Sequence, residues 1–407
     1  MLASSYPRFP GDGSGNFVEA LARAVAGLGH TVHVQAPTDP LAVKGHDSLV
    51  GVSRFPYSPL GSLQPMGYGK ALHNDRRLRL TAWLCAAPYF LSAVSRLLTT
   101  SGTWDLLHVH WLLPNGPPGV LTGRLVRKPV VVTLHGSDAF LAQSSRLLGP
   151  LARWSRDGAS AVTACSPDMA GFRAEIIPWG AHPQKFVHSD PLRWREGLGI
   201  PVGRPIVVAL GRLVEKKGFS CLLRAWKQVE NAVLVVGGDG VQRRLLEELA
   251  AALGISERVI FCGAIPWTEV PDFLAMAEAV AIPSVRDASG NQDGLPMVAL
   301  EAMAAGKPVV ASALGGLPLV VQDGVTGRLV PPDDPEALAT ALLELLASPV
   351  VARAMGQAGR ERVECELNWD NVARRYVEVY EQALQRTSRG AARPKAAVPQ
   401  LKHPRGL

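Results

Sequence analysis

The feature that most restricts the fold of this chain is a repeated order of apolar segment, glycine-containing loop and helix in its second half. Pro205–Leu210 is followed by Gly211–Gly218 and by an amphipathic segment at Phe219–Val229. The same order returns in further predicted strands at Ala232–Val236, Val259–Cys262, Ala279–Ile282 and Pro308–Ala311. Apolar strands that alternate with helices are typical of a parallel sheet covered on both faces. The second half therefore predicts a doubly wound α/β sheet.

The first half shows the same alternation less clearly. A Gly-rich loop at Gly11–Gly15 opens a helix, whereas the strand expected before it is almost absent and is predicted to be truncated. Val43–Arg79 is rich in Gly, Pro and Ser and is predicted to be a loop. Strands are predicted at Thr31–Ala36, Asp105–His110, Pro129–Leu134, Ala161–Cys165 and Glu175–Pro178. Together the two halves predict two facing Rossmann-like sheets with a cleft between them.

A chain of 407 residues is long enough for two domains with separate cores. We place an N-terminal domain at 1–185 and a second domain at 186–368, joined by a hinge at Trp179–Pro183. A C-terminal helix at 369–385 is expected to pack back towards the N-terminal domain. Residues 386–407 are basic and have little to bury, which predicts a disordered tail.

Two carboxylates, Asp293 and Glu301, stand on either side of seven residues at the start of a predicted helix. Pro296 suits the first helical position, because its missing N–H would be unsatisfied there in any case. A helix from Pro296 directs free N–H groups and the positive end of its dipole towards the loop that carries Asp293. This pattern favours an anion site, although a helix-stabilising acid and a solvated glutamate would look the same.

Arg212 and Lys217 follow the first strand of the second half and lie between glycines. Both cations could approach one diphosphate, Arg212 as a planar fork and Lys217 as a point charge, and a solvated basic turn is the alternative. Ligands of doubly wound sheets bind beyond the carboxyl ends of the strands, so the cleft should also collect His110 and His135. Neither of the Gly-rich loops, Gly11–Gly15 and Gly237–Gly240, continues as GxGxxG with an acidic residue about twenty positions on, which disfavours a nicotinamide cofactor. No cluster with metal-ligand spacing is recognisable.

Charge and cysteine content indicate the partners and the compartment. Residues 1–185 hold 17 Lys and Arg against 10 Asp and Glu, and residues 386–407 hold 6 against none, within a total net charge of +7. These basic regions favour an anionic partner, such as a membrane surface or a phosphate-bearing substrate, and without aromatic-interleaved basic stripes they do not favour nucleic acid. The uncharged run Leu80–Ser95 fits a core helix or an interfacial element. Five scattered cysteines and the lack of a signal peptide predict a reduced, cytoplasmic protein.

The motifs together resemble the retaining GT-B glycosyltransferases of family 4, over about residues 3–385. In the second half the resemblance rests on Gly211-Arg212-Leu213, Lys217-Gly218, Val236–Gly240, Pro283-Ser284 and Asp293 with Glu301. In the first half it rests on Gly11–Gly15, His110-Trp111 and His135-Gly136-Ser137-Asp138. The resemblance implies a nucleotide-sugar donor held mainly by the second domain and an acceptor held mainly by the first.

Carried over by position, the resemblance assigns roles to individual residues. Arg212 and Lys217 would neutralise the donor diphosphate, Glu301 would bind the ribose hydroxyls, and Asp293 would contact the donor sugar. His135 would lie near the sugar and His110 on the acceptor side, with a purely structural role open for each. The remaining donor contacts implied are Gly13, Ser14, Gly15, Gly238, Leu295, Pro296 and Met297. His135, Arg212, Lys217 and Asp293 would form the catalytic group.

The resemblance also implies the chemistry. Cations and helix N–H groups would stabilise the departing diphosphate, attack would come from the same face, and neither a divalent metal nor a cofactor would be needed. One position departs from the family pattern, since Asp293 stands where the family has Glu. Either the long polar loop before it brings Asp293 closer, or the sugar contact shifts to Asp287 or Asn291.

The predicted function is sugar transfer to a lipid-linked or polysaccharide acceptor of the cell envelope or exopolysaccharide, at the cytoplasmic face of the membrane. The basic first half, the Leu80–Ser95 run and the basic tail favour this acceptor. Two other functions remain open. One is a GT-B nucleotide-sugar 2-epimerase, which would bind the same donor without an acceptor. The other is a non-catalytic GT-B subunit that binds a partner enzyme or a lipid.

Overall fold

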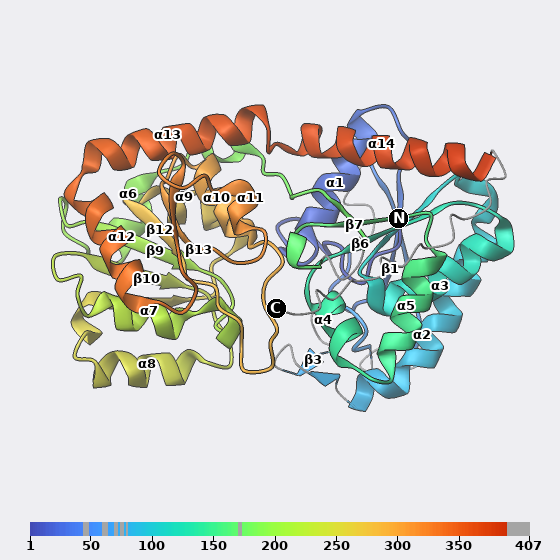
Figure 1. Ribbon diagram of the computed structural model, residues 1–407, viewed down its shortest axis with the longest axis horizontal. Coiled ribbons are helices and arrows are strands. Elements are labelled where there is room, and N and C mark those ends of the chain that lie inside the picture. The colour runs from blue at the N-terminus through green and yellow to red at the C-terminus, as the bar shows by residue number, and fades with distance from the viewer. Residues whose placement is uncertain are drawn as a thin grey trace, which may run out of the picture.

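The computed structural model describes residues 1–43, 49–58, 64–68, 72–73, 77–78, 80–169 and 173–388. Two parallel α/β sheets lie beside each other along the long axis of the molecule, with helices on both faces of each (Figure 1). The expected fold class, two Rossmann-like parallel sheets, is confirmed.

The N-terminal sheet is parallel throughout and has its core in runs of buried valines. Its strands are β1 (His33–Pro37), β2 (Gly51–Phe55), β5 (Leu107–His110), β6 (Val130–Leu134), β7 (Ala161–Ala164) and β8 (Glu175–Ile176). Leu2 joins β1 to β5, because it bridges in parallel to Gln35 on one side and Val109 on the other. The sheet order is therefore β2, β1, Leu2, β5, β6, β7, β8.

The helices of this domain are α1 (Asn16–Gly27), α2 (Leu80–Thr99), α3 (Leu112–Val126), α4 (Ser137–Ser144) and α5 (Leu148–Gly158), with 3-10 turns η1 (Ser101–Thr103) and η2 (Pro167–Met169) and a small antiparallel pair, β3 (Leu72–His73) and β4 (Arg77–Leu78). No helix was expected at α3, which contains Pro117 and Pro118. Leu113 has non-helical backbone angles, so both prolines lie near the start of the regular helix, where a missing N–H costs little.

The second sheet has the order β11, β10, β9, β12, β13, β14 and is also fully parallel. Its strands are β9 (Ile206–Leu210), β10 (Val233–Gly237), β11 (Val259–Gly263), β12 (Ala279–Ile282), β13 (Val309–Ser312) and β14 (Gly327–Val330). Its helices are α6 (Pro191–Gly197), α7 (Phe219–Trp226), α8 (Arg243–Ala252), α9 (Val270–Ala275), α10 (Met297–Ala304), α11 (Leu317–Val320), α12 (Pro335–Ala347) and α13 (Pro349–Cys365), with 3-10 turns η3 (Pro183–Phe186), η4 (Glu215–Lys217), η5 (Ser256–Arg258) and η6 (Trp267–Glu269).

The last helix, α14 (Trp369–Ser388), runs from the second domain across the first and packs against α1 and β6 (Figure 1). It buries Tyr376, Val379 and Ala383 in a core that is continuous across both domains. The helix includes residues 386–388, which were expected to belong to a disordered tail; residues 389–407 lie outside the described part of the chain.

Three further expectations differ from the structure. β2 lies inside Val43–Arg79, which was predicted to be a loop, and extends the sheet beyond β1. β14 adds an edge strand after β13 that the sequence analysis did not identify. Pro296 has an extended ψ of 119° and caps α10, so the helix begins at Met297 rather than at Pro296.

By length and apolar content, no single helix among the described residues could cross a membrane, and one sharply bent pair, α12 with α13, passes that test together.

Candidate functional site

The two domains meet at Gly294, beyond the carboxyl ends of both sheets. A Cβ atom on Gly294 would lie 2.6 Å from Met169 Cε, 2.8 Å from Cys165 Sγ and 3.0 Å from His135 O, all in the N-terminal domain. From the other side, a Cβ on Gly136 would lie 3.2 Å from Gly294 N. Only glycine lets these two backbones approach so closely. The site is therefore built around the loop that carries Asp293.

A direct hydrogen-bonded link holds the domains together beside this contact. Asp168 of the first domain accepts from Gln292 Nε2 at 2.6 Å and from Gly315 N at 3.0 Å, both in the second domain. A cavity of about 270 Å³ lies next to the link and is lined in part by Asn291 and Asp293. The cleft is thus narrow at this end, with polar groups on both walls.

Asp293 is held by two lysines that end the turn after β9. Its carboxylate lies 2.6 Å from Lys217 Nζ and 3.3 Å from Lys216 Nζ. Burial alone would raise the pKa of Asp293, but the two ammonium groups outweigh it and lower that pKa below the ordinary value. Both lysines belong to η4, and Gly218 ends the turn at a φ of 69°. A bound diphosphate would compete with Asp293 for these two cations.

Arg212 and Gly238 take different places in the neighbouring loops. Arg212 is exposed directly after β9. Gly238 has a φ of 125°, and a Cβ there would lie 1.9 Å from Gly211 O, so the close approach of the two loops requires glycine. Gly211 in turn packs beside the aliphatic stem of Lys217. The role of Arg212 and Gly238 as donor contacts stays a prediction, with a backbone role established for Gly238.

Glu301 lies on α10, is only 5% exposed, and its Oε1 has no hydrogen-bond partner among the described residues. Burial raises the pKa of Glu301 to about 7, although Lys185 and Lys217 act in the opposite direction. The carboxylate borders a cavity of about 420 Å³ that is lined also by Asn16, Arg23, His182, Met297 and Trp267. An unpartnered carboxyl group beside a cavity is suited to accept hydrogen bonds from a ligand.

The Gly-rich loop leads into α1, and the first residue of that helix, Asn16, lines this cavity. Gly15 caps α1 at a φ of 74°, and a Cβ there would lie 2.4 Å from Ser5 O. A Cβ on Gly13 would meet nothing within 4 Å, whereas Gly11 faces Thr268 of the second domain at 3.5 Å. Ser14 N already donates to Asp12 Oδ1 at 3.1 Å. Contact between Gly13–Gly15 and a ligand remains a prediction.

His110 and His135 lie next to each other in the N-terminal domain, and their assignment to the acceptor side and to the donor sugar stays a prediction. Nδ1 of His110 lies 3.3 Å from Nε2 of His135. His110 is 1% exposed and packs against His108 with tilted rings, while His135 packs against Phe17, whose ring centroid is 4.9 Å away. Burial lowers the pKa of both imidazoles, that of His135 to about 3. Both are therefore neutral near pH 7, and His135 is the one nearer Gly294.

Three residues of the site were given no role by the sequence analysis. Lys216 is buried against Asp293, and its signal was the Lys-Lys pair before Gly218. Asp138 accepts from the amides of Leu112, His135 and Gly136 at 2.6, 3.0 and 3.0 Å and so fixes the loop that carries His135. Asp168 forms the link between domains described above.

Asp287, an alternative contact for the sugar, is occupied within its own loop. Its carboxylate accepts from Ser289 N, Ser289 Oγ and Asn291 N at 2.9, 2.5 and 3.0 Å. These bonds make Asp287 a residue that shapes the loop before Asp293. Across the described ranges, no group of three or more His, Cys, Asp or Glu side chains is arranged to hold a metal ion.

Family models match both halves of the chain. Residues 191–362 match the model described as glycosyl transferases group 1, and residues 12–188 match a glycosyl transferase 4-like domain.

Curated relatives agree with these matches. The GDP-mannose-dependent α-(1-6)-phosphatidylinositol monomannoside mannosyltransferase of Mycolicibacterium smegmatis is 40% identical over 215 residues, 50% of this chain and 55% of the relative. The chain thus spans about half the length of this relative. The D-inositol 3-phosphate glycosyltransferase of Nocardia farcinica is 32% identical over 317 residues, 70% of this chain and 67% of the relative.

Solved structures share the fold. Sucrose-phosphate synthase from Thermosynechococcus elongatus superposes with a TM-score of 0.71 at 25% identity, covering 91% of this chain and 93% of that one. HepE of Anabaena, solved in complex with UDP-glucose, gives a TM-score of 0.69 at 20% identity over 93% and 98% of the two chains.

Proposed function

Because the chain belongs to the group 1 glycosyl transferase family and has its GT-B fold, we propose that it moves a sugar from a nucleotide-diphosphate sugar to an acceptor hydroxyl, with retention of configuration. The observation that carries the proposal is the buried Glu301 carboxyl, whose Oε1 has no hydrogen-bond partner among the described residues, beside the cavity of about 420 Å³. Two neighbouring ribose hydroxyls are the donors that such a carboxylate accepts best, since each of its oxygens can take one. The names of both curated relatives fit a sugar transferase.

The charges of the second domain suit the departure of a nucleoside diphosphate. Breaking the bond between the anomeric carbon and the phosphate oxygen places negative charge on the diphosphate. In this proposal Lys216, Lys217 and the N-terminus of α10 stabilise that charge. The contact of both lysines with the carboxylate of Asp293 supports an anion site there. The acceptor oxygen forms the new bond to the anomeric carbon from the same face, and its proton passes to the departing phosphate oxygen. In this proposal Asp293 contacts the sugar hydroxyls.

The proposal assigns charge neutralisation to lysine side chains and helix N–H groups and therefore includes neither a divalent metal nor a cofactor. Full activity is expected in the presence of EDTA. If EDTA abolishes turnover and added Mg²⁺ or Mn²⁺ restores it, this part of the proposal is wrong.

We further infer a glycan or lipid-linked acceptor of the cell envelope or an exopolysaccharide, presented at the cytoplasmic face of a membrane. α2 supports a lipid surface, because it leaves Leu80, Leu84 and Leu91 more than half exposed and places Trp83 beside them. The basic N-terminal half would favour anionic headgroups. The relative from Mycolicibacterium smegmatis carries a phosphatidylinositol derivative in its name. Five free cysteines, three of them buried, support a reducing compartment.

A screen of nucleotide-sugars, read as nucleoside diphosphate released with and without membrane lipid extract, tests the proposal. Transfer predicts release that depends on one nucleotide-sugar and increases with the extract. Conversion of the donor without release would indicate a 2-epimerase, and binding without turnover would indicate a non-catalytic subunit. Co-sedimentation with vesicles of phosphatidylglycerol at low salt tests the membrane contact, and the Leu84→Ser, Leu91→Ser variant is expected to sediment less.

A further inference from the structure

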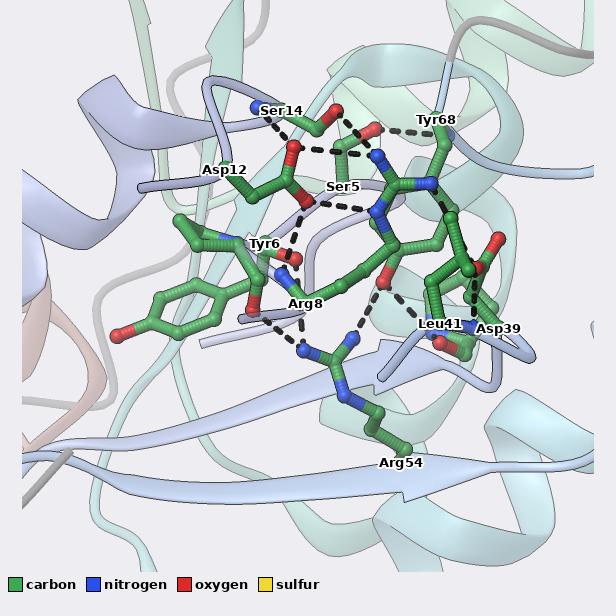
Figure 2. A network of polar contacts seen from close by, with 11 residues as sticks. Ser5, Tyr6, Arg8, Asp12, Ser14, Asp39, Leu41, Arg54 and Tyr68 are labelled. Carbon is green, nitrogen blue, oxygen red and sulfur yellow. Dashed lines mark hydrogen bonds and ion pairs between the residues drawn. The ribbon is translucent and has the colours of Figure 1, made fainter. Parts of the chain in front are cut away.

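Arg8 and Arg54 hold the loop that precedes α1 through hydrogen bonds and ion pairs, as Figure 2 shows. Arg8 makes a bidentate contact with Asp12 through one edge of its guanidinium, with Nε 2.6 Å from Oδ2 and Nη2 3.1 Å from Oδ1. Its backbone N–H also donates to Asp12 Oδ2 at 3.0 Å. A second carboxylate, that of Asp39 after β1, lies 3.5 Å from Arg8 Nη1. Arg8 is therefore the shared cation of two buried carboxylates.

Arg54 on β2 also binds this loop. Its Nη2 donates to Pro7 O at 2.6 Å, and its Nη1 donates to the hydroxyl of Tyr68. Tyr68 N donates in turn to Ser5 Oγ at 2.9 Å (Figure 2). Arg54 donates its hydrogen bonds to backbone carbonyl oxygens and to a phenol, and so fixes the backbone of the loop. Arg8 instead forms ion pairs with the carboxylates.

Asp12 places a negative charge inside the Gly-rich loop. It accepts from Ser14 N at 3.1 Å, one residue before the cap of α1, and Arg8 Nη2 lies 3.3 Å from Ser14 Oγ. Its side chain is 6% exposed. Burial would raise the pKa of Asp12, but the hydrogen bonds from Arg8 and Ser14 lower it to about 2, so the carboxylate is ionised at neutral pH.

The position of this loop makes that charge relevant to the donor. Gly13 is exposed with open space at its Cα, and Gly11 faces Thr268 across the cleft. Asn16, which follows the loop, lines the same cavity as Glu301. A carboxylate without a balancing cation at this place would repel a diphosphate. It would also offset the attraction of the positive end of α1 for an anionic ligand.

We propose that Arg8 is a positioning residue for donor binding, which cancels the charge of Asp12 and holds the Gly11–Gly15 loop where it can meet the diphosphate of a nucleotide-sugar. The proposal rests on the proposed function. Arg8 does not touch the reacting atoms in this account. Its contribution is electrostatic, and it acts through Asp12 and Ser14.

Four proteins test the proposal by calorimetry: wild type, Arg8→Ala, Asp12→Asn and the double variant. UDP, GDP and ADP are titrated first into the wild type, and the tightest is used throughout, with its uncharged nucleoside as the control ligand. We expect Arg8→Ala to weaken the nucleoside diphosphate at least about tenfold and the double variant to recover most of that loss. The affinity for the nucleoside should stay constant across all four proteins.

The variants are compared by thermal unfolding, because a buried carboxylate left without its partner destabilises a fold. Asp12→Asn keeps the acceptor for Ser14 N and is expected to bind the diphosphate as tightly as the wild type or more tightly. Arg244→Ala, on the exposed face of α8, makes the same change in net charge and should leave affinity unaltered.

The outcomes separate the two levels of the argument. A wild type that binds none of the three nucleoside diphosphates contradicts the proposed function itself. If the wild type binds one of them, three results would overturn the role of Arg8 alone. These are an unchanged affinity in Arg8→Ala, a double variant as weak as Arg8→Ala, or an Asp12→Asn variant that binds more than threefold weaker. Should Arg8→Ala not fold, the Asp12→Asn result decides.

Discussion

The two walls of the cleft use their polar residues in opposite ways. In the second domain, Glu301 is buried with an oxygen that has no partner among the described residues, and Lys216 and Lys217 converge on one carboxylate. In the N-terminal domain, Asp138 is occupied by three backbone amides and Asp12 by Arg8. The second domain thus presents groups that suit a ligand, whereas the first uses its charges to fix loops.

This difference has a consequence for mutagenesis. Buried polar groups that are fully hydrogen-bonded stabilise a fold, while unsatisfied ones destabilise it and are retained where they bind a ligand. Substitutions on the second domain's wall should therefore change ligand affinity more than stability. Substitutions on the N-terminal wall should lower the free energy of unfolding first.

The largest effect is expected for Lys217→Met, which removes the cation nearest Asp293 and keeps the aliphatic stem beside Gly211. Affinity for the nucleoside diphosphate should fall about 100-fold, or about 2.7 kcal/mol, when measured by calorimetry. The midpoint of urea unfolding should change little, because Lys216 still pairs with Asp293. Lys227→Met, at an exposed lysine after α7, is the matched control; equal losses in both variants would contradict the site.

On the N-terminal wall, Asp138→Asn should act on stability. Its amide group turns a donor towards one of the N–H groups of Leu112, His135 and Gly136, which leaves a buried donor unpaired. We expect a loss of about 2–3 kcal/mol in the free energy of unfolding, measured with urea. Asp157→Asn, at an exposed aspartate, should cost almost nothing. A stable Asp138→Asn variant that has lost only donor affinity would break the comparison.

Glu301→Gln should raise the free energy of unfolding at alkaline pH, in contrast to Asp138→Asn, which should lower it. Burial raises the pKa of Glu301 to about 7, so the folded protein disfavours the ionised form, and this cost appears as pH rises from about 4.5 to 7. At pH 8 the variant should therefore be more stable than the wild type by about 3 kcal/mol, and at pH 5 the difference should be below about 1 kcal/mol. Urea unfolding at both pH values measures the difference.

The same variant has a signature in binding. If the ionised carboxylate accepts the ribose hydroxyls, wild-type affinity for the intact nucleotide-sugar should rise about tenfold between pH 6 and pH 8, as the ionised fraction increases. The diphosphate of a nucleotide-sugar is esterified at both ends and keeps its charge in this range. Glu301→Gln should bind weakly and without pH dependence, and a parallel rise in both proteins would exclude this role.

The sequence predicted the second domain's wall better than the first for a physical reason. Lys217, Asp293 and Glu301 follow apolar strands of one parallel sheet, and their loops must meet at its carboxyl edge. Which of two adjacent lysines would be buried was not predictable, because it depends on the 3-10 turn η4. The start of α10 was misplaced by one residue, since proline suits both the cap and the first turn.

The N-terminal wall depends on contacts that no local pattern contains. Asp138 reaches the amide of Leu112, 26 positions earlier, and Asp168 reaches Gln292 in the other domain. β2 was not predicted because it lies in a segment rich in Gly and Pro, and α3 was not predicted because it contains prolines. Fixing loops requires partners from several elements, and their register appears only in the folded chain.

The smallest effect concerns the helix that ties the chain's end to the N-terminal wall. The hydroxyl of Tyr380 on α14 lies 2.7 Å from His108 Nδ1, and His108 Nε2 lies 2.6 Å from Thr133 Oγ1. His108 packs against His110, which contacts His135. Tyr380→Phe should lower the free energy of unfolding by about 1 kcal/mol, because Nδ1 loses its partner while Nε2 keeps Thr133.

Donor affinity of Tyr380→Phe should equal that of the wild type, since the change lies behind the wall and not in the cleft. Ser388→Ala removes an exposed hydroxyl from the same helix and serves as the control in urea unfolding. If Tyr380→Phe had unchanged stability but reduced donor affinity, the contacts from His108 through His110 to His135 would couple α14 to ligand binding. The N-terminal wall would then affect donor binding through these histidines as well as through the Gly11–Gly15 loop.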